Sequence, residues 1–257
     1  MTRETNAMGL LEIRSVTKFF GGLKAISDVS LSVEKGDIVG LIGPNGAGKT
    51  TLFNLISGVY RPDQGDIYFD GQCITGRKPY QCCRTGIGRT FQIVQTYTKR
   101  DVLYNVTLAA LSRCKRVGLA HEKASEVLHF VDLWKKKGQM GGSLTIADRK
   151  RLEVAKALAT APKLLLLDEV MAGLNPLEIE AAIALIHKIR DTGITIFLIE
   201  HVMAVVMSLS QRIAILHYGE KIGEGPPHEI SKDPKVIEAY LGEEFLFDGK
   251  DSSFEEI

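Results

Sequence analysis

One segment of the sequence combines glycine, lysine and threonine at a spacing that suits phosphate binding. GPNGAGKTT, at 43–51, fits the pattern G-x-x-x-x-G-K-[ST] and lies between an expected strand and an expected helix. Glycines let the backbone wrap an anion with its N–H groups pointing inward, and the helix N-terminus adds a positive partial charge. We therefore predict that this loop binds nucleotide phosphates. Its residues are Gly43, Pro44, Asn45, Gly46, Ala47, Gly48, Lys49, Thr50 and Thr51.

Two residues of this loop have separate expected roles. Lys49 is placed to reach the β- and γ-phosphates, and the Thr50 hydroxyl is placed to ligate Mg²⁺. The alternative is a glycine-rich turn with a chance lysine. Since the pattern arises by chance roughly once in a hundred chains of this size, the strand before it and the helix after it favour a nucleotide site.

A second group of candidate residues ends the apolar run LLLLDE, at 164–169. A buried strand would deliver Asp168 to its C-terminal end, where open α/β sheets bind ligands. Asp168 is then a candidate Mg²⁺ ligand opposite the phosphate loop, and Glu169 is a candidate general base for water. An acidic helix cap after a buried strand is the alternative, which the nearby phosphate loop disfavours.

Two further polar residues follow short apolar stretches. His201 comes directly after ITIFLIE, in a strand that should lie beside the strand carrying Asp168. A lone histidine at a helix start is by default structural. Gln92, in GRTFQ, is by itself typical of a surface residue. Neither residue carries a functional assignment on its own.

The elements that must position these residues are predicted from hydrophobic periodicity and turn signals. Expected strands cover residues 11–16, 29–33, 38–42, 66–70, 164–167, 194–199 and 213–216. Expected helices cover residues 48–58, 102–111, 121–134, 147–158 and 176–189. Fully apolar strands separated by helices imply an α/β fold, a mostly parallel sheet with helices on both faces. Strand signals are missing from about 93 to 160, which predicts an inserted helical subdomain.

Composition restricts the class of protein. The 257 residues include 32 basic and 31 acidic side chains, so the net charge of +1 excludes a general nucleic-acid binder. No apolar run approaches the ~20 residues needed to cross a bilayer, and the N-terminus lacks a signal-peptide core. We expect a cytoplasmic protein with one domain over residues 8–242. Residues 243–257 carry six acidic residues and one lysine, which predicts a solvated acidic tail.

Taken together, the order of these segments resembles the nucleotide-binding subunit of ABC transporters over nearly the whole chain. The resemblance implies a P-loop NTPase core with additional N-terminal antiparallel strands, and ATP with Mg²⁺ as ligands. It implies that Gln92 helps to hold magnesium and senses the transmembrane partner, and that His201 hydrogen-bonds the γ-phosphate. It further implies that Phe20, in KFFGG, stacks on adenine, with Phe19 as a possible substitute.

Finer features are similar to the ATPase subunits of branched-chain amino acid importers. They are the segment 18–58, GIGRTFQ at 86–92, VMAGLNP at 170–176 and DPKVIEAYLGEE at 233–244. Importers of urea, amides or aromatic acids share much of this pattern and stay an alternative. The resemblance implies ATP hydrolysis that powers an importer from the cytoplasmic face of the inner membrane. It implies permease subunits and a second ATPase subunit as partners, with a periplasmic or extracellular binding protein involved indirectly.

The chain departs from the family at its signature, LSGGQ, which here reads LTIAD at 144–148. Thr145 keeps a hydroxyl, but Ile146 and Ala147 replace both glycines. Asp148 replaces the glutamine and adds a negative charge, which the adjacent basic run at 149–151 could offset. The resemblance implies that Thr145 and Asp148 contact the ATP bound to the opposite subunit.

These departures bear on the expected assembly. The loop after Glu169 also departs, with Asn175 where an aspartate is usual. Because both segments cap the ATP of the opposite subunit in the family, we expect weak ATPase activity from this chain alone and a heterodimer with a consensus subunit. A homodimer in which LTIAD caps normally is the alternative.

Three other classes of protein are alternatives to an importer subunit. A soluble ABC-type ATPase of repair or translation usually has two cassettes or a coiled-coil insertion, and the sequence shows neither. A kinase would need an acceptor-binding lid, whereas Glu169 with His201 suits attack by water. A non-catalytic nucleotide-binding module would be favoured if Glu169 were missing.

Overall fold

The computed structural model describes residues 9–91 and 95–236. Its larger sheet consists of β3 (Ile38–Ile42), β6 (Ile87–Arg89), β7 (Leu164–Asp168), β8 (Thr195–Ile199), β9 (Arg212–His217) and β10 (Glu220–Gly225). The strand order is β10-β9-β3-β8-β7-β6. The strands from β9 to β6 pair in parallel, and β10 pairs antiparallel with β9. The expected mostly parallel sheet is confirmed.

A second sheet is antiparallel and is built mainly from the first 73 residues. It consists of β1 (Leu11–Phe20), β2 (Leu23–Val33), β4 (Gln64–Phe69) and β5 (Gln72–Cys73), in the order β2-β1-β4-β5. The turn between β4 and β5 contains Asp70 and Gly71, both at positive φ, as the Asp-Gly signal predicts. The additional antiparallel strands implied by the resemblance are therefore present.

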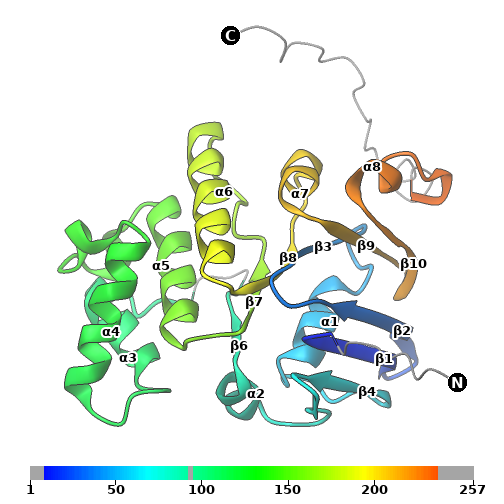
Figure 1. Cartoon of the computed structure of the whole chain (residues 1–257), viewed down its shortest axis with the longest axis horizontal. Coiled ribbons are helices and arrows are strands. Elements are labelled where there is room, and N and C mark those ends of the chain that lie inside the picture. The colour runs from blue at the N-terminus through cyan, green and yellow to red at the C-terminus, as the bar shows by residue number, and fades with distance from the viewer. Residues whose placement is uncertain (1–8, 92–94, 237–257) are drawn as a thin grey trace, which may run out of the picture.

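Helices cover both sides of the parallel sheet and one of its ends (Figure 1). They are α1 (Lys49–Ile56), α2 (Pro79–Thr85), α3 (Val102–Ala110), α4 (Val117–Phe130), α5 (Ile146–Ala159), α6 (Pro176–Asp191), α7 (Met203–Leu209) and α8 (Pro227–Ile230). Two short 3-10 helices, Trp134–Lys136 and Gly141–Ser143, connect α4 to α5. Figure 1 places α6 and α7 on one face of the sheet, α1 on the other, and α3 to α5 beside the β6–β7 end.

Strand β8 shows how the sheet divides the core. Ile196 and Leu198 belong to the hydrophobic cluster that includes side chains of α5, α6 and α7. Phe197 and Ile199 belong to the cluster formed with α1 and the antiparallel sheet. Successive strand residues point to opposite faces, so a fully apolar strand must be covered on both sides. The α/β fold with both faces covered is confirmed.

The helix expected at 121–134 is displaced, because α4 spans Val117–Phe130. Gly118 lies in its first turn, where it does not interrupt the helix. Asp132 has a φ of 59°, a left-handed conformation that an α-helix cannot continue. The prediction was wrong by four residues at this end, because the apolar spacing continued past the backbone break.

Several short elements were not predicted: α2, β6, α7, β10 and α8. Helices α3 to α5 lie within the stretch assigned to a helical subdomain, whereas Met8 and the tail at 243–257 lie outside the described residues. The domain limits stay a prediction. Among the described residues, no helix is both long and apolar enough to cross a membrane.

Candidate nucleotide-binding site

The glycine-rich loop joins the end of β3 at Ile42 to the start of α1 at Lys49. A Cβ atom on Gly43 would lie 2.1 Å from the carbonyl oxygen of Leu216, and one on Gly48 would lie 2.6 Å from that of Ala25. Gly48 also has a φ of 102°. Glycine is therefore required at both positions, because the loop packs directly against the backbones of β9 and β2.

Lys49 is buried inside this loop, 6% exposed. Its ammonium donates hydrogen bonds to the carbonyl oxygens of Gly43, at 2.5 Å, and Pro44, at 2.9 Å. Thr50 follows in the first turn of α1 and is exposed. The loop thus holds a cation at the N-terminus of a helix, where an anion is favoured by both the charge and the helix dipole.

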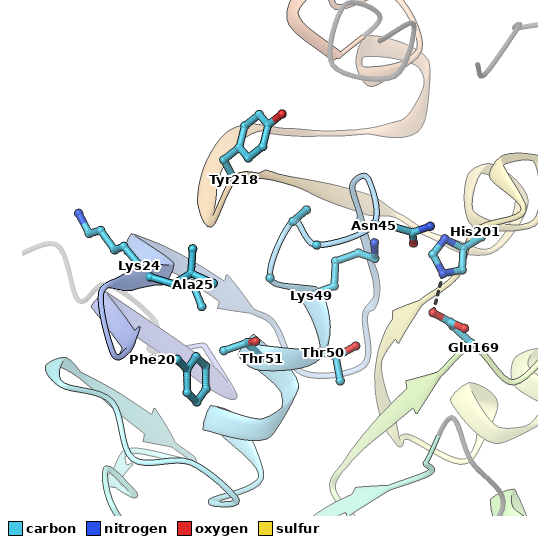
Figure 2. A pocket seen from close by; sticks show the side chains of 14 residues that line it. Phe20, Lys24, Ala25, Asn45, Lys49, Thr50, Thr51, Glu169, His201 and Tyr218 are labelled. Atoms are coloured by element: carbon cyan, nitrogen blue, oxygen red, sulfur yellow. Dashed lines mark hydrogen bonds and ion pairs between the residues drawn. The ribbon is translucent and has the colours of Figure 1, made fainter. Parts of the chain in front are cut away.

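The loop borders a cavity of about 480 Å³, within the size range of small-ligand sites. Figure 2 shows Phe20 and Lys24 on one side of it, with Glu169 and His201 on the other. Five separate parts of the chain therefore meet at one cavity. Its lining residues are Phe20, Leu23, Lys24, Ala25, Asn45, Gly46, Ala47, Gly48, Lys49, Thr50, Thr51, Glu169, His201 and Tyr218.

Phe20 lies at the mouth of this cavity and is 41% exposed. Its ring packs edge-on against Tyr60 with centroids 5.1 Å apart, and the Lys18 ammonium lies 5.6 Å from its centroid. A partly exposed aromatic ring that lines a cavity can stack on a flat ligand. Phe19, the possible substitute, is not among the residues that line the cavity.

Asp168 and Glu169 end strand β7, which pairs in parallel with β8 and places Asp168 opposite Ile199. The prediction that the His201 strand lies beside the Asp168 strand is confirmed. Asp168 is 1% exposed, and burial raises the pKa of its carboxyl, with Arg89 acting in the opposite direction.

The Glu169 carboxylate faces His201, with Oε1 2.5 Å from Nε2 (Figure 2). The Glu169 backbone N–H donates to the Ile199 carbonyl at 2.9 Å, and the Lys150 ammonium donates to the Glu169 carbonyl at 2.6 Å. The residue has a φ of 50°. Its carboxylate is therefore held in one orientation at the edge of the cavity.

The oxygen donors of Asp168 and Thr50 suit a hard cation. Asp168 Oδ1 is buried and has no hydrogen-bond partner among the described residues. A buried carboxylate oxygen without a partner is costly in a protein interior, and a cation coordinated there would remove that cost. The Thr50 hydroxyl supplies a second donor of the same class. The described residues contain no cluster of three or more His, Cys, Asp or Glu side chains suited to a metal.

The signature residues LTIAD lie at the start of α5 and do not line the cavity. Thr145 is the N-cap: its hydroxyl accepts from the Asp148 N–H at 3.2 Å and donates to Asp148 Oδ2 at 2.9 Å. Asp148 is buried and forms an ion pair with Lys136. Arg149 and Lys150 donate to backbone carbonyls, so the direct ion pair of Asp148 is with Lys136, and the offset expected from residues 149–151 stays a prediction.

Asn175 and Gln92 are the other two residues that the sequence singled out. Asn175 is the N-cap of α6, where its side chain and Glu178 form a reciprocal capping box. Gln92 lies outside the described residues.

Several residues of the site were missed by sequence reasoning. Tyr218, in the turn between β9 and β10, lines the cavity, as do Leu23, Lys24 and Ala25 of β2. Arg89 and Thr90 hold Asp168, and the only available signal was their place in GIGRTFQ. Loop and strand-end residues carry no periodic pattern, so their side-by-side placement depends on the sheet order.

A glycine-rich phosphate-binding loop before a helix, with acidic residues at the end of another parallel strand of the same sheet, defines a P-loop nucleotide-binding domain. Comparison with known families shows which family of P-loop proteins this chain matches. Residues 26–172 match the family described as ABC transporter, and residues 220–246 match the branched-chain amino acid ATP-binding cassette transporter family. The chain belongs to the family of ABC transporter ATP-binding proteins.

Similarity to individual proteins and solved structures supports this assignment. The high-affinity branched-chain amino acid transport ATP-binding protein BraF of Pseudomonas aeruginosa is 38% identical over 252 residues, covering 91% of this chain and 98% of BraF. A nucleotide-free ATP-binding cassette from an ABC transporter superposes with a TM-score of 0.85 at 32% identity, covering 92% of this chain and 100% of its own. A dimeric post-hydrolysis cassette bound to ADP and Pi superposes with a TM-score of 0.76 at 25% identity, covering 84% of this chain and 98% of its own.

Proposed function

We propose that this chain is the ATP-binding and ATP-hydrolysing subunit of an ABC importer for branched-chain amino acids. The observation that carries the proposal is the convergence of the phosphate loop, Glu169 and His201 on one cavity. The match of residues 220–246 to the branched-chain amino acid transporter family, and the 38% identity to BraF, support the substrate class.

The cavity suggests how ATP binds. The adenine stacks on Phe20, and the phosphates lie in the loop at 43–51, where backbone N–H groups and Lys49 neutralise their charge. Thr50 and Asp168, together with Gln92, would hold Mg²⁺. When bound there, the ion would supply positive charge to offset the negative charge that develops on the phosphates during hydrolysis.

Hydrolysis uses the pair at the other side of the cavity. Glu169 orients a water molecule and accepts its proton as the water oxygen bonds to the γ-phosphorus and the bond to the ADP oxygen breaks. His201, whose Nε2 lies 2.5 Å from Glu169 Oε1, orients that carboxylate and contacts the γ-phosphate. The products are ADP and inorganic phosphate.

Transport requires partners. The chain acts as one of two ATPase subunits and is held at the cytoplasmic face of the inner membrane by permease subunits. A periplasmic or extracellular binding protein delivers the substrate to those permeases. The dimeric form of a similar cassette supports the two-subunit arrangement.

The proposal is tested by reconstituting the full chain with the permease subunits that co-purify with it. We expect ATP hydrolysis that rises when a substrate-loaded binding protein for leucine, isoleucine or valine is added. Failure of the chain to associate with any permease would favour the soluble ABC-type ATPase. Stimulation only by urea, an amide or an aromatic acid would change the substrate.

The signature at the start of α5 bears on the assembly, and we propose a heterodimer in which this chain supplies the weaker cap. The Ile146 side chain is 59% exposed at the N-terminus of α5, where the opposite ATP would approach the free backbone N–H groups. Thr145 is engaged in its own cap and Asp148 is paired with Lys136. Capping of the opposite ATP by this chain therefore depends on the backbone N–H groups at the start of α5, which the Ile146 side chain covers.

Weak ATPase activity is expected for this chain alone, and Ile146→Gly with Ala147→Gly should raise it by about tenfold or more, equivalent to about 1.4 kcal/mol. Asp148 is kept, because its ion pair with Lys136 holds the start of α5. The measurement is steady-state ATP hydrolysis at several protein concentrations.

Glycine costs about 1 kcal/mol per helical position, so loss of stability needs a control. Val117→Gly changes an equally exposed residue in the first turn of α4, 68% exposed, away from the signature. Rapid, cooperative hydrolysis by the unmodified chain, with no gain from the double substitution, would favour a homodimer with normal capping.

A further inference from the structure

Arg89 is a buried arginine at the end of β6, with its side chain 7% exposed. One terminal nitrogen donates to Asn54 Oδ1 at 2.6 Å and to Ser57 Oγ at 2.9 Å. The other terminal nitrogen donates to Asp168 Oδ2 at 3.1 Å. The planar guanidinium therefore connects α1 to the end of β7 in a single rigid group.

The ion pair between Arg89 and Asp168 uses only one of the two oxygens of the Asp168 carboxylate. Oδ2 accepts from Arg89, whereas Oδ1 is buried and unpartnered among the described residues. The Thr90 hydroxyl, directly after β6, accepts from the Asp168 N–H at 3.0 Å, so Arg89 and Thr90 together hold the side chain and the backbone of Asp168. The rotation of the carboxylate is set by these contacts, and Oδ1 is left without a hydrogen-bond partner among the described residues.

The partners on α1 add a second constraint. Asn54 and Ser57 lie on the helix that begins with Lys49 and Thr50. Since Arg89 binds α1 and Asp168 together, it sets the position of the carboxylate relative to the helix that carries the Thr50 hydroxyl. These are two of the oxygen donors to which the proposed function assigns Mg²⁺.

We propose that Arg89 is a positioning residue for the Mg²⁺ site: it binds Asp168 Oδ2, turns Oδ1 toward the ion and fixes the carboxylate relative to α1. The proposal rests on the proposed function, since it concerns the same nucleotide site. Arg89 itself touches neither nucleotide nor metal. Its charge also offsets that of Asp168, because an unpaired carboxylate at this depth would be strongly destabilising.

Lysine is the informative replacement. Arg89→Lys keeps the positive charge but replaces the planar fork with a single ammonium group, which cannot reproduce separate contacts to α1 and to Asp168. A residue that only balances charge would tolerate this change. A residue that orients Asp168 would not.

The experiment measures ADP affinity of the full chain by calorimetry, first in EDTA and then at increasing Mg²⁺ concentration, so that no hydrolysis occurs. For Arg89→Lys we expect unchanged ADP affinity in EDTA. We expect the Mg²⁺ midpoint, the Mg²⁺ concentration that gives half of its effect on ADP affinity, to be about tenfold higher than in the wild-type chain. Arg212→Lys is the matched control, because Arg212 also lies on a sheet strand and pairs with a carboxylate, Glu224, at 2.9 Å.

A double substitution distinguishes a loss of Asp168 orientation from an effect on Mg²⁺ binding that does not act through Asp168. On an Asp168→Asn background, Arg89→Lys should cause no further change in Mg²⁺ dependence, because the group through which it acts has been altered. If Arg89→Lys does not fold, Asn54→Ala removes one anchor of the guanidinium while keeping the ion pair. It should shift the Mg²⁺ midpoint in the same direction by a smaller factor.

The outcomes are distinct. An unchanged Mg²⁺ midpoint in Arg89→Lys, or an equal shift with and without the Asp168 carboxylate, would overturn the positioning role while leaving the proposed function intact. Failure of the wild-type chain to bind ADP at any Mg²⁺ concentration would overturn the proposed function itself, and the positioning role with it.

Discussion

Replacing Glu169 with glutamine is expected to abolish ATP turnover while ATP binding is retained. Glutamine has almost the same shape as glutamate but cannot accept a proton from water. The structure holds this carboxylate at the cavity edge, beside His201 and with its backbone anchored to Ile199 and Lys150. A positioned general base typically contributes about 10²- to 10⁴-fold to the rate, so a loss of that size is expected.

The measurement is single-turnover hydrolysis together with equilibrium binding of ATP. Glu178→Gln is the matched control, because Glu178 is the next acidic residue after Glu169 and glutamine can replace glutamate in its capping box. Hydrolysis by Glu169→Gln at the wild-type rate would show that another group activates the water.

Replacing Lys49 with alanine is expected to weaken ATP binding itself. The ammonium is buried at the loop that would surround the phosphates, and it is fixed there by the carbonyls of Gly43 and Pro44. A hydrogen bond to a charged group contributes about 1.5–3 kcal/mol, which corresponds to roughly a tenfold to hundredfold loss of affinity.

The loss should appear as a higher dissociation constant in calorimetric titration. Lys24→Ala removes the same charge from another residue that lines the cavity and serves as the control. Its effect should be a few-fold at most, because an exposed ammonium is screened by water and salt. Equal affinities of Lys49→Ala and the wild-type chain would exclude the assigned role of Lys49.

Local patterns in the sequence were sufficient for the central elements of the fold. The apolar run at 38–42 and the helix after Gly48 were predicted where β3 and α1 lie, with Leu52, Phe53, Leu55 and Ile56 on the buried side. Strand and helix periods of 2 and 3.6 residues are properties of neighbouring residues, so they can be read without knowledge of the fold. The glycine-rich loop is equally local, since its spacing alone predicts its conformation and its chemistry.

The contacts around the acidic residues depended on the tertiary structure. Arg89 lies 79 residues before Asp168, and His201 lies 32 residues after Glu169. Each pair meets because β6, β7 and β8 are adjacent in the sheet. The adjacency of β7 and β8 was expected, whereas β6 was not predicted as an element, so the Arg89–Asp168 contact appeared only in the folded structure.

The signature segment shows the same division between sequence and structure. Its sequence predicted a helix from residue 147 and a charge at Asp148 that the adjacent basic residues could offset. Only the packing of the segment between α4 and α5 decided that Lys136, and not the adjacent basic residues, pairs with that carboxylate. A side chain's partner is set by which groups the folded backbone brings within about 3 Å of it, and that distance depends on the whole chain.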